Sequence, residues 1–270
     1  MDNQRRKFLK LAGAAALAGI GAPTLVRLSS SSALAAEHGA SAEPHGKTID
    51  PGPQGIRLGM IIDMRKFTEQ PMLLDRAVTA CNEAHNIPLI DSAKSEIKWI
   101  WKTPFENAFP EQSSYHMAKN VKDSEFLVLC NHCDEPPCVR ACPTQATFKL
   151  KTNGIVAMDY HRCIGCRFCM AACPYGARSF NWEDPRPYIK KYNKDFATRM
   201  RGVVEKCTFC AERLALGLEP ACVEACQGTG AMVFGDLNDG QSEIRQLLDQ
   251  EFAIQRNPSL GTKPSVFYIV

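Results

Sequence analysis

The sequence predicts an α+β fold in which small sheets and short helices are organised around repeated groups of cysteines. Twelve of the thirteen cysteines in the 270-residue chain fall into three compact groups of four. Two groups end in matching segments, ACPTQA at 141–146 and ACPYGA at 172–177, which indicates an internal repeat. Short β-branched stretches lie before, between and after the groups. These features predict tandem modules with approximate twofold symmetry and inserted loops.

The second group of cysteines has the spacing of an iron–sulfur site. It reads CIGCRFCMAACP at 163–174, a C-x2-C-x2-C-x3-C-P run. In bacterial-type ferredoxins the first three cysteines of such a run bind one 4Fe-4S cluster, and the fourth binds the neighbouring cluster. Zinc needs only four thiolates in two C-x2-C pairs, so the third closely spaced cysteine favours iron. We therefore predict a bacterial-ferredoxin-like module with two clusters over residues 129–180.

The first group, a C-x2-C-x4-C-x3-C-P variant at 130–143, completes this module. If the fourth cysteines are exchanged, one cluster is bound by Cys130, Cys133, Cys138 and Cys173. The other is then bound by Cys163, Cys166, Cys169 and Cys142. His132 and His161 flank these cysteines, but the ligand count is complete without them. We expect the two histidines to adjust cluster potentials through hydrogen bonds rather than to bind iron.

The third group, C-x2-C-x11-C-x3-C at 207–226, is less specific and by itself suits zinc as well. Beside two clusters it favours a third 4Fe-4S cluster, which lengthens the electron path. The remaining Cys81 resembles the end of another ferredoxin motif, in which the first three cysteines are replaced at 71, 74 and 77. If exchange extends to this pair, Cys81 joins Cys207, Cys210 and Cys222, and Cys226 is left over. The alternative keeps Cys226 as the ligand and makes Cys81 a buried free thiol.

Residues 1–35 predict a twin-arginine export signal. QRRKFLK at 4–10 precedes an Ala- and Gly-rich stretch at 11–26, and ALA at 33–35 offers a cleavage site. An uncleaved anchor is the alternative, but about 16 apolar residues are short for a membrane span. Because this route carries folded proteins, clusters inserted in the cytoplasm would be protected from an oxidising compartment. We expect a periplasmic protein that associates with the membrane through partner subunits.

Charge and missing motifs exclude several function classes. The chain carries a net charge of +3, and residues 1–35 hold five basic residues and one acidic residue, so the remainder is nearly neutral. This balance does not indicate a nucleic-acid partner. No G-x-x-x-x-G-K-[ST] or G-x-G-x-x-G sequence occurs, so no nucleotide cofactor is predicted. The chain also has no C-x-x-C-H site for covalent haem.

The remaining segments are assigned from composition and periodicity. Residues 36–58 predict a flexible tether, and 59–128 hold the degenerate first motif plus an insertion. Strands are predicted at 60–63, 97–102, 154–159 and 264–270, with Trp99 and Trp101 sharing one face. Residues 181–235 contain a polar connector and the third cysteine group. Within 236–270, residues 239–255 predict one amphipathic helix before the last strand.

The CNHCDEPPC element at 130–138 and the third group resemble the iron–sulfur electron-transfer subunits of polysulfide, nitrite and dimethyl sulfoxide reductase complexes. The resemblance covers residues 59–235 and implies an electron-transfer subunit with no substrate site of its own. Members of this family typically carry four clusters, but only Cys81 of the first motif is present here, so three 4Fe-4S clusters are expected. The implied partners are an NrfD-type quinone-reactive membrane subunit and a multihaem c-type cytochrome subunit. The export signal with three clusters is most similar to the DsrO-type subunits of DsrMKJOP complexes in dissimilatory sulfur metabolism. Alternatives are a subunit of another reductase complex and a free-standing cluster-based reductase.

Overall fold

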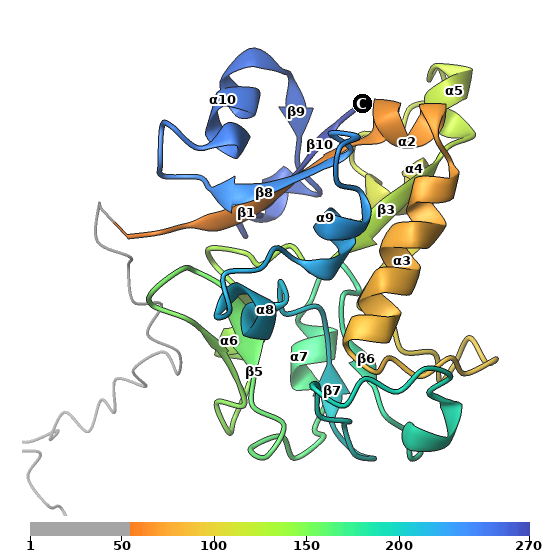
Figure 1. Ribbon diagram of the computed structural model, residues 1–270, viewed down its shortest axis with the longest axis vertical. Helices are drawn as coiled ribbons and strands as arrows, with labels where there is room; N and C mark the ends of the chain where they lie inside the picture. The colour runs from red at the N-terminus through yellow and green to blue at the C-terminus, as the bar shows by residue number, and fades with distance from the viewer. Residues whose placement is uncertain (1–54) are drawn as a thin grey trace, which may run out of the picture. The chain divides into compact units, whose positions relative to one another are not determined.

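A four-stranded sheet joins the two ends of the chain that the structure describes (Figure 1). Its order is β8 (Met232–Asp236), β1 (Leu58–Asp63), β10 (Val266–Ile269) and β9 (Ala253–Ile254). Strand β1 pairs with β8 in antiparallel register and with β10 in parallel register. The computed structural model describes residues 55–270, so the predicted export signal and almost all of the predicted tether lie outside the described residues. The strands predicted near residues 60–63 and 264–270 are confirmed.

Alternating residues of β1 serve two separate cores, as the period of two in a strand requires. Ile61 packs in a small cluster with Ile244 of α10 (Glu243–Gln250). Met60 and Ile62 point to the opposite face and belong to the main core, which also contains several cysteines. The sheet therefore has a covering helix on one face and the cysteine-bearing part of the chain on the other.

Helices α2 (Met64–Glu69) and α3 (Met72–Ala84) follow β1. The side chain of Asp63 caps α2 by accepting a hydrogen bond from the Arg65 backbone N–H at 3.0 Å. Helix α3 buries one face, formed by Leu73, Leu74, Ala77 and Cys81. Met72 is 78% exposed and does not belong to this face. Met72 begins the helix, and its side chain leaves the buried face.

The insertion forms a hairpin of β2 (Ile100–Pro104) and β3 (Glu125–Leu129), with α4 (Phe105–Ala108) and α5 (Lys119–Lys122) between the strands. The strand predicted at 97–102 therefore begins three residues later than expected. Trp99 precedes the strand, is fully buried and donates its indole N–H to Glu205 at 2.8 Å. Trp101 lies within β2 and is only half-buried, so the two indoles do not share one environment.

Short elements connect the cysteines. Helices α6 (Pro137–Arg140) and α7 (Phe168–Ala171) occupy corresponding places, each ending just before the fourth cysteine of its group. Strands β4 (Thr147–Lys149) and β5 (Val156–Met158) form a hairpin, which confirms a strand within 154–159. The connector contributes β6 (Ser179–Phe180), η1 (Arg186–Tyr188) and β7 (Val204–Glu205), and β6 pairs with β7.

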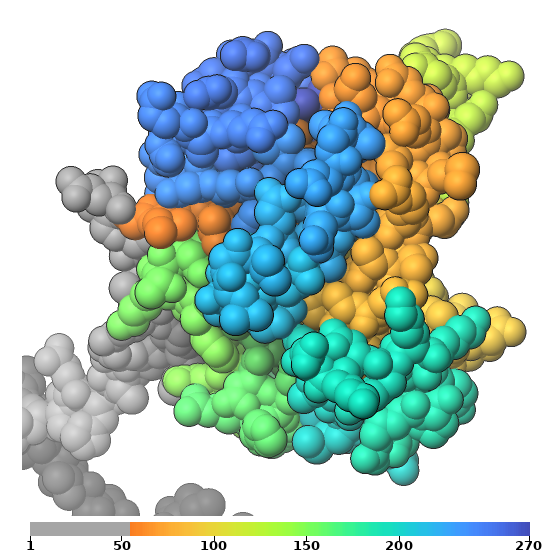
Figure 2. All heavy atoms as spheres, in the orientation of Figure 1, coloured from red at the N-terminus to blue at the C-terminus, as the bar shows by residue number. Residues whose placement is uncertain are grey.

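Cys207 and Cys210 lie just before α8 (Ala211–Leu214), Cys222 lies on α9 (Ala221–Ala225), and Cys226 follows α9. Helix α9 contacts both α3 and β8, so distant parts of the chain meet at this group. Figure 2 shows this segment in light blue, with α3 on one side and the C-terminal layer above it. Among residues 55–270, every helix is too short or too polar to cross a membrane.

Helix α10 is shorter than predicted. It begins after Ser242, whose hydroxyl accepts from the Arg245 backbone N–H, and it ends at Gln250 rather than at residue 255. Residues Ala253–Ile254 leave the helix because they pair with β10 as strand β9. Phe252 is consequently 86% exposed instead of lying on the apolar side of the helix. A short η2 (Pro258–Leu260) leads into the last strand.

Candidate metal centres

The first C-x-x-C pair of each of the three groups has the same backbone turn. The residue before the second cysteine is left-handed in each pair: His132 has φ 41°, Gly165 has φ 69° and Phe209 has φ 54°. Such a residue tightens the loop and turns the chain between the two cysteines. At Gly165 a Cβ atom would lie 2.4 Å from the carbonyl oxygen of Gly202, so this position requires glycine. The common turn indicates that all three loops are shaped for the same kind of ligand.

Backbone amides contact the thiols of these loops. The Phe209 N–H donates to Cys207 Sγ at 3.4 Å, and the Ala221 N–H donates to Cys210 Sγ at 3.4 Å. The Val204 N–H lies 3.5 Å from Cys163 Sγ. Amide donors of this kind stabilise thiolate ligands and adjust the potential of a bound cluster.

The structure brings Cys130, Cys133, Cys138 and Cys173 together. Burial raises the pKa of the Cys133 thiol to about 12, and the neighbouring thiols of Cys130, Cys138 and Cys173 add to the rise. Burial also raises the pKa of Cys173, again with contributions from Cys130 and Cys138. The fourth cysteine of the second motif therefore lies beside the first motif, as ligand exchange requires.

The second predicted ligand set, which comprises Cys163, Cys166, Cys169 and Cys142, is more exposed than the first. Burial raises the pKa of the Cys169 thiol, and the nearby thiols of Cys142 and Cys163 add to this effect. Burial opposes the ionisation of Cys142, but hydrogen bonds from Thr147 and Thr144 outweigh it and lower the pKa of this thiol. Cys163 and Cys166 are half-buried and lie in the loop before α7, the helix that carries Cys169.

The third group includes Cys81. The thiols of Cys207 and Cys222 are deeply buried, which raises their pKa values, and Cys81 is a neighbour of both. Burial likewise raises the pKa of Cys81, with Cys210 among the contributing neighbours. Burial raises the pKa of Cys226 to about 11, and the charge of Arg76 opposes this rise. The geometry thus favours Cys81 as the fourth member and leaves Cys226 beside the group, although the ligand itself stays a prediction.

The three groups form a row. Cys207 of the third group is close enough to Cys130 of the first group for their charges to interact. Cys169 of the second group interacts in the same way with Cys138 of the first group. The first group, Cys130, Cys133, Cys138 and Cys173, therefore lies between the other two. Any redox centres held by these thiols would be placed as successive steps of one path.

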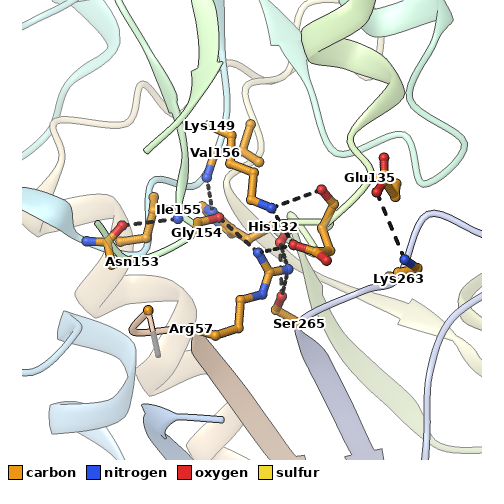
Figure 3. A network of polar contacts seen from close by, with 12 residues as sticks. Arg57, His132, Glu135, Lys149, Asn153, Gly154, Ile155, Val156, Lys263 and Ser265 are labelled. Atoms are coloured by element: carbon orange, nitrogen blue, oxygen red, sulfur yellow. Dashed lines mark hydrogen bonds and ion pairs between the residues drawn. The ribbon is translucent and has the colours of Figure 1, made fainter. Parts of the chain in front are cut away.

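A polar network connects the loop that contains Cys130 and Cys133 to the four-stranded sheet (Figure 3). The guanidinium of Arg57, just before β1, donates to the carbonyl oxygen of His132 at 3.0 Å and pairs with Asp134 at 2.9 Å. It also donates to the hydroxyl of Ser265, which donates to the same carbonyl at 3.0 Å. Lys149 of β4 provides a second cation to Asp134. Residues from both ends of the described chain thus position the cysteines at 130 and 133.

Buried polar atoms without protein partners fit a bound cofactor at these groups. Among the described residues, ten buried side-chain atoms have no hydrogen-bond partner, and five of them lie beside cysteines. These five atoms belong to Asn131, His132, Thr208 and Arg178. Three of these residues lie inside C-x-x-C pairs, where donors would face the sulfides of a cluster. Groups of four cysteine thiolates, surrounded by polar atoms that have no hydrogen-bond partner, fit 4Fe-4S clusters.

His85, which belongs to none of the sequence motifs, lies against the third group. Its Nδ1 is 3.6 Å from Cys81 Sγ, and its Nε2 is 2.8 Å from Glu212 Oε1. Burial opposes protonation, but hydrogen bonds with Cys210, Cys81 and Glu212 raise the pKa of His85. His85, Cys210 and Glu212 offer donor atoms within 4.8 Å of one another, a set that resembles part of a metal site. Since Cys210 also belongs to a four-cysteine group, we interpret His85 and Glu212 as hydrogen-bonding neighbours.

The two histidines considered from sequence differ sharply. His132 is fully buried, stacks on Phe209 with ring centroids 3.7 Å apart, and accepts the Val156 N–H at its Nδ1. Its Nε2 has no partner among the described residues. His161 is exposed. Only His132 is therefore placed to influence a bound cluster through its surroundings.

Comparison with known proteins gives a consistent result. The model of the 4Fe-4S dicluster domain matches residues 124–191 and 186–237. The Hdr-like menaquinol oxidoreductase iron–sulfur subunit 1 of Archaeoglobus fulgidus is 38% identical over 98% of this chain and 97% of its own. The menaquinone reductase iron–sulfur cluster-binding subunit of Nitratidesulfovibrio vulgaris is 35% identical over 79% and 89%. Protein NrfC of Escherichia coli is 35% identical over 87% and 90%.

Proposed function

Because the chain belongs to the 4Fe-4S dicluster family of iron–sulfur electron-transfer subunits, we propose that it conducts electrons between a membrane quinone-reactive subunit and other redox subunits of a respiratory complex. The observation that carries this proposal is the row of three cysteine groups, with the first group in the middle. The row gives electrons a continuous path through the protein. Relatives named as menaquinol oxidoreductase and menaquinone reductase subunits support a quinone-reactive partner.

Three 4Fe-4S clusters would occupy these groups, and each would supply one-electron redox chemistry. The first cluster is held by Cys130, Cys133, Cys138 and Cys173, and the second by Cys163, Cys166, Cys169 and Cys142. The third is held by Cys207, Cys210, Cys222 and Cys81. The chain's own contribution is to fix the thiolates, to direct amide donors at them and to exclude water from the two more buried groups. The corresponding positions of α6 and α7 support tandem modules.

The membrane partner in this proposal is an NrfD-type subunit, and a multihaem c-type cytochrome subunit is the second redox partner. The DsrO-type assignment and a role in dissimilatory sulfur metabolism follow from the export signal combined with three clusters. Membership of another reductase complex is the second candidate, because Protein NrfC matches the chain over a similar length.

The periplasmic location rests on residues 4–10, which lie outside the described part of the chain. A test replaces Arg5 and Arg6 together with lysine and follows the full-length protein in cell fractions. Export by the twin-arginine route predicts that the variant accumulates in the cytoplasm with its clusters intact. Unchanged periplasmic accumulation of the variant would contradict this part of the proposal.

The electron-transfer role is tested with the purified protein and with membranes that contain its quinone-reactive partner. A reduced menaquinone analogue should bleach the cluster absorption when the partner is present and leave it unchanged when the partner is absent. Turnover of a small oxyanion by the isolated chain would instead support a free-standing reductase. Equal reduction with and without the partner membranes would also contradict the proposal.

A further inference from the structure

Arg178 is a buried cation that directly contacts a cysteine sulfur. The residue is 5% exposed, and its Nη2 donates to Cys138 Sγ at 3.0 Å and to Thr147 Oγ1 at 2.8 Å. Its Nη1 lies 3.2 Å from the sulfur of Met158. Within residues 55–270 no carboxylate comes within ion-pair distance of this guanidinium, and its Nε has no hydrogen-bond partner.

The position of Arg178 reflects the internal repeat. Arg178 follows Cys173 at the same spacing at which Thr147 follows Cys142. These two equivalent residues are in contact, because the guanidinium of Arg178 donates a hydrogen bond to the hydroxyl of Thr147. The repeat therefore supplies one cation, from its second copy, at a point where both halves come together.

Thiolates take the place of a carboxylate partner. The guanidinium contacts Cys138 directly, and Cys138 and Cys169 lie in one buried cluster of side chains. Cys138 belongs to the first group, and Cys169 belongs to the second. Arginine keeps its charge in proteins, and a buried unpaired charge is strongly unfavourable. The buried guanidinium is therefore stable only if the cysteine sulfurs of the first and second groups carry negative charge.

We propose that Arg178 is a positioning residue shared by the first and second clusters, which favours the reduced form of both and raises their midpoint potentials together. Reduction adds one negative charge to a cluster, and a cation in a medium of low dielectric constant stabilises the more negative state more strongly. Among the described residues the guanidinium contacts a cysteine of the first group and none of the third, so the third cluster should gain little from this charge. The inference rests on the proposed binding of clusters by both groups.

The test is a redox titration of the full-length, cluster-loaded protein, followed by EPR. Arg178→Met removes the charge and keeps an unbranched side chain, whereas Arg178→Lys keeps the charge. Arg186→Met is the matched control, because it removes one positive charge from an exposed pair with Asp184. We expect Arg178→Met to shift the midpoint potentials of the first and second clusters to more negative values and to leave the third unchanged. Arg178→Lys should restore most of the shift, and Arg186→Met should cause none.

Several outcomes would overturn the inference. Unchanged potentials in Arg178→Met would show that the charge has no effect on the clusters. An equal shift of all three clusters would indicate general loosening rather than a local charge. Loss of the first or second cluster in both Arg178→Met and Arg178→Lys would mean that shape rather than charge matters. Loss in Arg178→Met alone would support the inference, because it would show that the charge is required at the site.

Iron analysis of the unmodified protein separates this inference from the proposed function. Absence of clusters in the unmodified protein would sink the function itself. Clusters that are present but insensitive to Arg178→Met would sink only the role of this residue.

Discussion

His85 connects Cys81 to Glu212 at the edge of the third cysteine group. The imidazole Nδ1 lies 2.9 Å from the Cys81 carbonyl oxygen, and Nε2 lies 2.8 Å from Glu212 Oε1. Both oxygens are acceptors, so the ring donates at each nitrogen and is held in one orientation. The ring also stacks on Trp99, with centroids 4.7 Å apart. A fixed donor beside Cys81 gives this cysteine a defined place although its own motif is incomplete.

His85→Gln should therefore change the third cluster selectively. The variant removes a cationic donor near Cys81 and Cys210, so the midpoint potential of this cluster should become more negative. EPR-monitored redox titration measures the shift, and the other two clusters provide an internal reference. His116→Gln, at an exposed histidine, is the matched control. A third-cluster potential equal to that of the control would contradict the role assigned to His85.

Replacement of single cysteines separates the two ligand assignments. Cys81→Ser should remove or convert the EPR signal of one cluster, because Cys81 lies among Cys207, Cys210 and Cys222. Cys226→Ser should keep all three signals, since the thiol of Cys222 is affected more by Cys81 than by Cys226. Iron content and EPR at low temperature measure both effects. Loss of a signal in Cys226→Ser but not in Cys81→Ser would assign Cys226 as the ligand. Ligand exchange would then be restricted to the two-cluster module at residues 129–180.

The cysteine grouping was predictable from the sequence, because ligand spacing within a loop is a local property. The structure places Cys173 beside Cys130 and Cys138, and Cys142 beside Cys169, whereas the exchange of cluster ligands stays a prediction. Strands at both ends of the chain were also predictable from short apolar runs. Local patterns thus indicated the modules and their candidate ligands, but not the residues that surround them.

Contacts between distant segments were not predictable. His85 follows α3 and Glu212 lies on α8, more than 120 positions later, and neither residue belongs to a recognised motif. Arg178 contacts Cys138 although the two residues are far apart in the sequence, so the sequence does not indicate the contact. The early end of α10 has a similar cause, since pairing of Ala253 with β10 overrides the helical pattern. Each of these features depends on tertiary contacts, which local sequence patterns do not specify.

Gly165→Ala tests the turn shared by the cysteine loops. The left-handed backbone disfavours a side chain by roughly 1–2 kcal/mol, and the new Cβ would also overlap the Gly202 carbonyl oxygen. Gly176→Ala is a matched control, because its φ is +62° and no atom lies within 4 Å of the place that an alanine methyl group would occupy. Thermal unfolding and iron retention should show a larger loss for Gly165→Ala. Equal losses would mean that the contact with Gly202 is unimportant.

Arg199→Met tests the buried ion pair behind the third group. Arg199 Nε lies 2.8 Å from Glu205 Oε2, and both side chains are almost completely buried. Removal of one partner leaves an uncompensated charge, which should lower the free energy of unfolding by about 3–5 kcal/mol. Arg245→Met, which breaks an exposed pair with Asp249, should cost less than about 1 kcal/mol. Denaturant titrations of the cluster-loaded variants measure both values, and similar costs would contradict the importance of burial.

The most direct test of the account is a metal and sulfide analysis of the full-length protein purified without oxygen, combined with a count of free thiols after denaturation. The account predicts about twelve irons and about twelve inorganic sulfides per chain, with three reducible EPR-active centres. Stoichiometric zinc without iron, or cystine bridges between the grouped cysteines, would contradict the conclusion that this chain conducts electrons.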